Sequence, residues 1–173
     1  ISYRLIHTGQ HYDDSMSNNF FKDLSIPKPN HNLNCKSGSQ SEQTAKIMIA
    51  YEKILLKKKS DLCIVVGDVN STMACAIAAK KTGIKVAHIE SGLRSKDLKM
   101  PEEINRIITD SISDYFFTTS RSASNNLIRE GKDRNKIFFV GNLMIDSLFL
   151  YKNLLKKSEK IEKLIDKKRY IVL

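Results

Sequence analysis

Short apolar segments that alternate with helical patterns constrain the fold of this chain more than any other feature. Segments rich in strand-forming residues lie at 3–7, 62–66, 85–89, 115–118, 137–140 and 170–173. Apolar or alanine residues with helical spacing occupy 47–55, 71–81, 102–113 and 122–130. Strands that are almost wholly apolar and alternate with helices indicate a parallel sheet covered on both faces. We therefore predict an α/β fold with a doubly wound, Rossmann-like parallel sheet.

Local signals refine this pattern. Prolines predict a loop over 26–32, and the polar segment 36–41 is expected to end as a helix N-cap. Gly131 is expected to close the helix at 122–130. In the helix at 102–113, isoleucines follow the spacing of one helical face, at positions 104, 107, 108 and 112.

The order of these patterns predicts the domain organisation. The chain opens inside a strand pattern and ends on a new one, with a basic helical pattern over 146–168 before it. We expect an N-terminal Rossmann-like domain over 1–146 that lacks its first strand, a linker helix over 147–169, and the start of a truncated second domain at 170–173.

Charge and cysteine content narrow the class of protein. The net charge is +10, and lysines and arginines gather at 57–59 and 152–169 without interleaved aromatic residues or a nucleic-acid motif. This favours solvated helix surfaces over a nucleic-acid partner. No apolar run is long enough to cross a membrane. Three cysteines without paired spacing argue against a disulfide framework, and Cys63 and Cys75 lie in patterns typical of buried positions, so we expect a cytoplasmic protein.

Polar and acidic residues follow the predicted strands, and ligands of doubly wound folds bind at that edge of the sheet. The segment 67–72, Gly-Asp-Val-Asn-Ser-Thr, could turn the chain, cap the next helix and favour an anion, or could be a plain turn. Glu90 directly follows a strand and could act as a general acid or base near Asp68, or form an ion pair with Arg94.

The remaining candidates have ordinary structural explanations as well. Pro101, Glu102 and Glu103 are typical of a helix start. His88 in a strand is more often a hydrogen-bonded core residue, whereas His11 lies in a loop at the ligand edge. No set of His, Cys or Asp has metal-ligand spacing, so we predict no metal. The sequence contains neither the Gly-x-Ser-x-Gly motif of serine hydrolases nor a Walker phosphate-binding loop, so these two classes of enzyme have no support.

Several of these segments, in order and with matching spacing, resemble the UDP-N-acetylglucosamine 2-epimerase family. The motifs are His-Thr-Gly-Gln-His-Tyr-Asp at 7–13, Phe-Phe-Lys-Asp-Leu at 20–24, and Gly-Asp-Val-Asn-Ser-Thr at 67–72. They continue with Ala-His-Ile-Glu-Ser-Gly-Leu-Arg at 87–94, Met-Pro-Glu-Glu-Ile-Asn-Arg at 100–106, Thr-Asp at 109–110 and Val-Gly-Asn at 140–142. Together they cover most of the chain.

The resemblance implies the N-terminal half of a two-domain, GT-B-like isomerase that binds a nucleotide-sugar in the cleft between its domains. Members of the non-hydrolysing type interconvert UDP-GlcNAc and UDP-ManNAc for surface polysaccharides, as homodimers and without a cofactor. They remove the C2 proton, eliminate UDP and add it back. The catalytic carboxylates of the family correspond to Asp68, Glu90 and Glu102. We expect nearby polar residues to bind substrate, namely Gln10, His11, Asn70, Ser71, Arg94 and Asn142.

The chain also departs from the family pattern. The opening strand with its Gly-Thr-Arg-Pro-Glu signature and the second domain are both absent, so we expect this piece alone to be inactive. Ser91 stands where many relatives have Ala, and Gln10-His11 is followed by Tyr12 rather than the Arg associated with substrate activation. The alternatives are a hydrolysing 2-epimerase, an epimerase of a modified UDP-sugar, and a GT-B glycosyltransferase.

Overall fold

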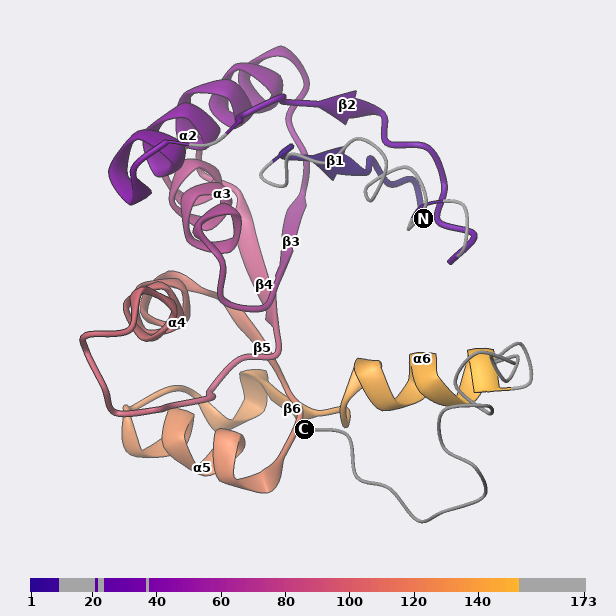
Figure 1. Cartoon of the computed structure of the whole chain (residues 1–173). Helices are drawn as coiled ribbons and strands as arrows, with labels where there is room; N and C mark the ends of the chain where they lie inside the picture. Colours follow the sequence, from indigo (N-terminus) through magenta and orange to yellow (C-terminus); the bar gives the residue numbers. More distant parts are fainter. Residues whose placement is uncertain (10–20, 22–23, 37, 153–173) are drawn as a thin grey trace, which may run out of the picture. The chain divides into compact units, whose positions relative to one another are not determined.

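The structure is a computed structural model that describes residues 1–9, 21, 24–36 and 38–152 (Figure 1). One compact unit spans Ile1–Gly141, and a second begins at Asn142. The strands of the first unit are β1 (Ile6–His7), β2 (His31–Asn32), β3 (Leu62–Val66), β4 (Lys85–Ile89), β5 (Tyr115–Thr118) and β6 (Ile137–Phe139). Its helices are α2 (Gln40–Lys57), α3 (Asn70–Lys81), α4 (Pro101–Ile112), α5 (Arg121–Arg129) and the 3₁₀ turn η1 (Arg134–Lys136).

The main sheet contains four parallel strands in the order β3-β4-β5-β6. Val66 pairs with Ile89, and Ile89 pairs with Phe117, so the carboxyl ends of β3, β4 and β5 lie side by side. The predicted alternation of strands and helices is confirmed for these elements. The turns that follow β3 and β4 are therefore neighbours at one edge of the sheet.

Among the described residues, one face of β3 is buried and the other is exposed. Cys63 and Val65 are buried, whereas Leu62, Ile64 and Val66 are 40%, 60% and 52% exposed. Figure 1 shows α3, α4 and α5 on the same side of the sheet. The strand order explains this arrangement. Right-handed connections between parallel strands that follow one another in sequence place every helix on the same face.

The predicted loop over 26–32 is wrong at its end, because His31–Asn32 form β2 and pair in parallel with β1. Pairing between distant segments creates this strand. The backbone of Leu5 donates to the side chain of Asn30 (2.7 Å) and accepts from the backbone N–H of Asn30 (2.8 Å). The first predicted strand is correspondingly shorter, and only Ile6–His7 forms β1.

Helix α2 packs on α3 and supplies much of the core. It begins with a capping box, in which the Ser39 side chain accepts from Glu42 N–H and the Glu42 side chain accepts from Ser39 N–H. The core cluster joins α2, α3, β3 and β4, and includes Ile47, Tyr51, Leu55, Ala78 and Val86. All three cysteines are buried and free, as predicted for Cys63 and Cys75. Burial raises the pKa of the Cys63 thiol, which fits its role as a small apolar residue.

The buried face of helix α4 is not the isoleucine face that the sequence predicts. Ile104 and Ile107 are 43% and 38% exposed, whereas the buried residues of α4 are polar or charged, namely Glu103, Asn105, Arg106, Thr109 and Asp110. The periodicity of the isoleucines predicts the position of the helix correctly, but it does not predict which side is buried. Hydrogen bonds and ion pairs with the strand-end turns satisfy most of the buried polar groups of α4 instead.

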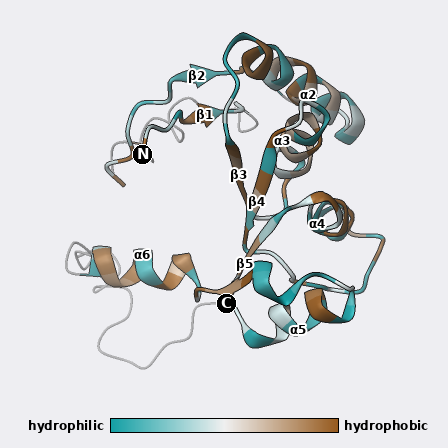
Figure 2. Cartoon of the chain, turned by 180° about the vertical axis from the view of Figure 1, so that it is seen from behind, coloured by the Kyte–Doolittle hydropathy of each residue, from teal (hydrophilic) through white to brown (hydrophobic). Residues whose placement is uncertain are grey.

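The second unit begins with α6 (Leu143–Tyr151), which is capped by Asn142 (Oδ1 to Met144 N, 2.9 Å). Figure 2 shows α6 as predominantly hydrophobic, and Met144, Leu148, Phe149 and Leu150 are more than half exposed. The predicted basic helix over 146–168 therefore begins earlier and is apolar where it is described. Most of the predicted linker and the strand at 170–173 lie outside the described residues. No described helix is both long and apolar enough to cross a membrane.

Candidate active site

Asp68 lies in the turn that leaves β3. Gly67, with φ of +71°, adopts the left-handed conformation that glycine tolerates best. The side chain of Asp68 is 34% exposed, and its Oδ2 lies 2.5 Å from Nη1 of Arg106. The side chain of Asn105 donates to the backbone carbonyl of Asp68 (2.9 Å). Helix α4 thus fixes both the side chain and the backbone of Asp68.

Glu90 occupies the corresponding turn after β4. Its φ is +69°, an unusual conformation for a residue with a side chain and one found often at functional sites. A Cβ on Gly67 would lie 3.6 Å from Oε2 of Glu90, so this carboxylate reaches the turn that carries Asp68. The alternative ion pair between Glu90 and Arg94 is not present, because Arg94 pairs with Asp110 and Glu130.

Glu102 is exposed on the first turn of α4. Asn105 and Arg106 follow it by three and four residues, which places all three on one side of the helix. Because the side chains of Asn105 and Arg106 reach Asp68, the start of α4 lies next to the Asp68 turn. The elements that carry the three predicted carboxylates therefore converge at the carboxyl edge of the sheet.

Glu103 has a structural role in the same helix. It is 1% exposed and accepts hydrogen bonds from the backbone N–H groups of Ser95 and Lys96 (3.0 and 2.9 Å) and from Arg106 (2.9 Å). Burial alone would raise the pKa of Glu103, but these hydrogen bonds and the charge of Arg106 outweigh it and lower the pKa to about 2. Glu103 thereby holds the loop between Glu90 and α4.

The other predicted binding residues are placed differently. Asn70 is 7% exposed, and its amide donates to Gln40 (2.6 Å) and Gln43 (2.8 Å), which gives it a structural role. Ser71, at the start of α3, hydrogen-bonds to Thr8 through its hydroxyl (2.9 Å). Gln10 and His11 lie outside the described residues. The expected side-chain cap of α3 is absent, since its N-cap is Val69.

The remaining two candidates also have structural partners. The guanidinium of Arg94 is 7% exposed and pairs with Asp110 (2.7 Å) and Glu130 (2.6 Å). Asn142 caps α6, and no substrate-facing position for it follows from this contact. Their binding roles stay predictions.

A buried network lies beneath the strand-end turns. His88 is fully buried, as expected for a hydrogen-bonded core histidine, and its Nδ1 lies 2.6 Å from Oδ1 of Asp110. Burial would raise the pKa of Asp110, but the hydrogen bond and charge of His88 and the charge of Arg94 lower it below its ordinary value of 3.8.

Sequence reasoning did not single out Asn105, Arg106 or Asp110 as part of the site. A signal existed, because these residues follow Glu102 at intervals of three, four and eight positions and therefore share its helical face. The isoleucines of the opposite face gave the stronger pattern.

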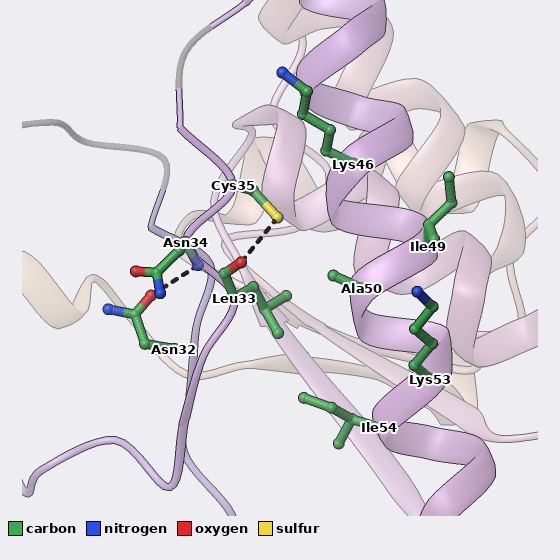
Figure 3. A pocket seen from close by; sticks show the side chains of 9 residues that line it. All are labelled: Asn32, Leu33, Asn34, Cys35, Lys46, Ile49, Ala50, Lys53 and Ile54. Carbon is green, nitrogen blue, oxygen red and sulfur yellow. Dashed lines mark hydrogen bonds between the residues drawn. The ribbon is translucent and has the colours of Figure 1, made fainter.

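A shallow cavity of about 490 Å³ lies elsewhere, between the segment after β2 and α2 (Figure 3). Leu33, Ile49 and Ile54 give it apolar walls, and Lys46 and Lys53 stand at its border. None of the predicted site residues lines this cavity. In the described part of the chain, no group of three potential metal ligands is found.

The chain is similar to proteins of one enzyme family over most of its length. The family model of UDP-N-acetylglucosamine 2-epimerase matches residues 1–173. A UDP-N-acetylglucosamine 2-epimerase of Methanocaldococcus jannaschii is 48% identical over 161 residues, which are 93% of this chain and 44% of that protein. A UDP-2,3-diacetamido-2,3-dideoxy-D-glucuronate 2-epimerase of Pseudomonas aeruginosa is 45% identical over 153 residues, 87% of this chain and 43% of that protein.

The crystal structure of the Methanocaldococcus jannaschii UDP-GlcNAc 2-epimerase in complex with UDP-GlcNAc and UDP superposes with a TM-score of 0.88 at 47% identity. The match covers 96% of this chain and 46% of that one, so the chain spans about half the length of the relatives it matches. The prediction of an α/β, parallel-sheet half of a GT-B-like molecule is thus confirmed. From its motifs, its fold and a family match over its whole length, the chain belongs to the UDP-N-acetylglucosamine 2-epimerase family.

Proposed function

We propose that the full-length protein interconverts UDP-GlcNAc and UDP-ManNAc, and that this chain supplies the carboxylates for proton transfer at C2. One observation carries the proposal. The turns that bear Asp68 and Glu90 and the first turn of α4, which bears Glu102, meet at the carboxyl edge of the parallel sheet. Nucleotides and their derivatives bind at this edge in open α/β sheets.

The proposed chemistry requires groups that transfer protons and positive groups that offset the negative charge of the carboxylates and of the departing UDP. A carboxylate removes the C2 proton while the bond from C1 to the UDP oxygen breaks, and UDP leaves with the bonding electrons. UDP then adds back to C1, and a proton is delivered to the opposite face of C2. We propose that Asp68, Glu90 and Glu102 share these proton transfers. Arg106, which contacts Asp68, offsets part of the negative charge at the edge.

Deuterium incorporation at C2 tests this proposal directly. The full-length protein would be incubated with UDP-GlcNAc in deuterated water beside Asp68→Asn, Glu90→Gln and Glu102→Gln variants. We expect C2 deuterium and UDP-ManNAc from the wild type and a loss of about 10²-fold or more in each variant. Asp114→Asn is the matched control, because Asp114 binds Lys80 and the backbone of Val86 at the opposite end of the sheet. Undiminished exchange in all three variants would contradict their roles.

The similarity to the Pseudomonas aeruginosa enzyme supports a modified UDP-sugar as the second candidate substrate. The 45% identity is close to the 48% shared with the Methanocaldococcus jannaschii enzyme. Turnover of UDP-2,3-diacetamido-2,3-dideoxy-D-glucuronate, without turnover of UDP-GlcNAc, in the same assay would identify the modified sugar as the substrate. Free UDP accumulating with turnover would instead indicate a hydrolysing enzyme.

We further propose that the full-length protein is a cytoplasmic homodimer that lacks a nucleic-acid partner. Exposed apolar residues on α4, Ile104 and Ile107, support self-association, since a contact between copies would remove them from water. Sedimentation of the full-length protein and of its Ile104→Lys variant tests the dimer. A monomeric wild type would exclude it.

A further inference from the structure

The three proposed catalytic carboxylates lie on different elements, and one buried side chain joins these elements. Asp110 is on α4, two turns beyond Glu102. Its side chain is 1% exposed and contacts both His88 and the turn that follows Glu90. Asp110 is therefore placed to fix the distances between the carboxylates without touching the substrate.

The first connection runs to the Asp68 turn through His88. Nδ1 of His88 lies 2.6 Å from Oδ1 of Asp110, and Nε2 lies 2.8 Å from the backbone carbonyl of Gly67. A carbonyl oxygen only accepts, and so does an ionised carboxylate. Nε2 of His88 therefore donates to the Gly67 carbonyl, and the ring joins this carbonyl to Asp110.

The second connection runs to the Glu90 turn. The backbone N–H of Gly92 donates to Oδ2 of Asp110 (3.0 Å), and Nη1 of Arg94 contacts the same oxygen (2.7 Å). Arg94 is anchored in turn by Glu130 at the end of α5 (2.8 and 2.6 Å). Both oxygens of Asp110 are thus engaged, one toward each catalytic turn.

The burial of this cluster points to a precise role. Burying charges is costly unless each is paired, and a fully paired cluster permits only a few arrangements of the attached backbone. Asp114, one turn later in the chain, also binds Lys80 and a strand backbone but is 23% exposed and lies at the far end of the sheet. Asp110 and Asp114 therefore form a natural pair for comparison.

We propose that Asp110 and His88 are positioning residues that hold Asp68, Glu90 and Glu102 at the separation needed for catalysis. The inference rests on the proposed epimerase function for its kinetic consequence. Misplacement of a reacting group by about 1 Å can lower a rate about 10²-fold, so small movements of the two turns are sufficient.

The test compares three single-residue variants of the full-length protein. Asp110→Asn leaves one accepting oxygen where there were two. His88→Asn keeps a donor toward Asp110 but is too short to reach the Gly67 carbonyl. Asp114→Asn is the control. Each is measured for kcat and KM with UDP-GlcNAc, for thermal stability, and for amide hydrogen exchange of the segments 67–72 and 88–96.

We expect Asp110→Asn to speed exchange in both segments and His88→Asn to speed it mainly in 67–72. Both variants should lose about 10–100-fold in kcat, with KM changed by less than about threefold. Asp114→Asn should lower thermal stability without these changes. Exchange at wild-type rates in both turns, or a kcat loss no larger than that of Asp114→Asn, would overturn the proposal.

The exchange measurement needs no substrate. A wild type that is inactive on UDP-sugars would therefore defeat the proposed function, and the exchange rates of the two turns would still decide whether Asp110 and His88 fix them.

Discussion

At the scale of single residues, two buried hydroxyl groups are distinctive. Those of Ser91 and Thr109 have no hydrogen-bond partner among the described residues. A buried polar group without a partner loses its hydrogen bonds to water and gains none in return. Ser91 directly follows Glu90, and Thr109 directly precedes Asp110, so both hydroxyls lie next to residues of the proposed site.

We predict that Ser91→Ala does not destabilise the protein and raises its free energy of unfolding by up to about 1 kcal/mol, because an unpaired hydroxyl is removed. Urea unfolding of the full-length protein measures this change. Ser120→Ala is the matched control, because the Ser120 hydroxyl caps α5 (Ala123 N, 3.2 Å) and its loss should cost about 1 kcal/mol. A destabilised Ser91→Ala variant would show that its hydroxyl has a partner.

Glu103 makes the free energy of unfolding depend on pH in the acid range. Its pKa of about 2 in the folded state lies below the ordinary value of 4.5, so the ionised form favours folding. This contribution to stability is fully present above about pH 4.5, the ordinary pKa, and is lost as the pH falls through about 2. We predict that Glu103→Gln lowers stability at pH 7 and shows a flatter decline between pH 4.5 and 2, measured by urea unfolding at each pH. Parallel curves for both proteins would contradict this.

At the scale of elements, the packing of the Glu90 turn against α5 depends on Gly92. Its φ is +80°, and a Cβ there would lie only 2.4 Å from the backbone carbonyl oxygen of Ala123. The side chain of Asn126 also donates to the Gly92 carbonyl (3.0 Å). The turn that carries Glu90 thus packs directly against the backbone of α5.

We predict that Gly92→Ala destabilises the full-length protein by about 3 kcal/mol or more, since strain and a backbone clash combine. Gly131→Ala separates the two effects. Gly131 has the same φ of +80° at the end of α5, but a Cβ there would meet nothing within 4 Å, so this change should cost only about 1–2 kcal/mol. Thermal unfolding of both variants checks the difference, and equal losses would rule out the clash.

At the scale of the whole molecule, the chain spans about half the length of its relatives, and the proposed site draws its carboxylates from this half alone. We expect the site to lie between two domains, as the resemblance to the family implies, so that this half offers only part of the contacts that a nucleotide-sugar needs. We therefore expect the carboxylates of this half alone to bind substrate weakly, because a ligand site usually encloses most of its ligand.

We predict that residues 1–173 alone show no detectable deuterium exchange at C2 of UDP-GlcNAc, whereas the full-length protein exchanges this hydrogen. The reason is that charge on the departing UDP requires stabilisation from groups beyond this chain. Nuclear magnetic resonance of the sugar in deuterated water measures both. Exchange by the isolated chain at a rate comparable to the full-length protein would show that this half suffices.

The sequence by itself determined the main strands, the helices and the motifs at the strand ends. These features depend on local spacing, as in the capping box of Ser39 and Glu42 or the glycine that closes α5 at Gly131. The parallel sheet followed from the alternation of the elements, and the carboxyl edge followed from the parallel sheet. Asp68 and Glu90 could therefore be expected at this edge before any contact was known, whereas Glu102 became a candidate only through the resemblance to the family.

Only the tertiary structure decided which faces are buried and which side chains pair with one another at the site. The pairing of His31–Asn32 with β1, the polar buried face of α4 and the contact of His88 with Asp110, 22 residues apart, all join segments that are distant in sequence. Local patterns favoured the isoleucines of α4 as its core face. Paired charges at the strand ends stabilise the opposite orientation, because burial of a polar group depends on partners that only the folded chain brings together.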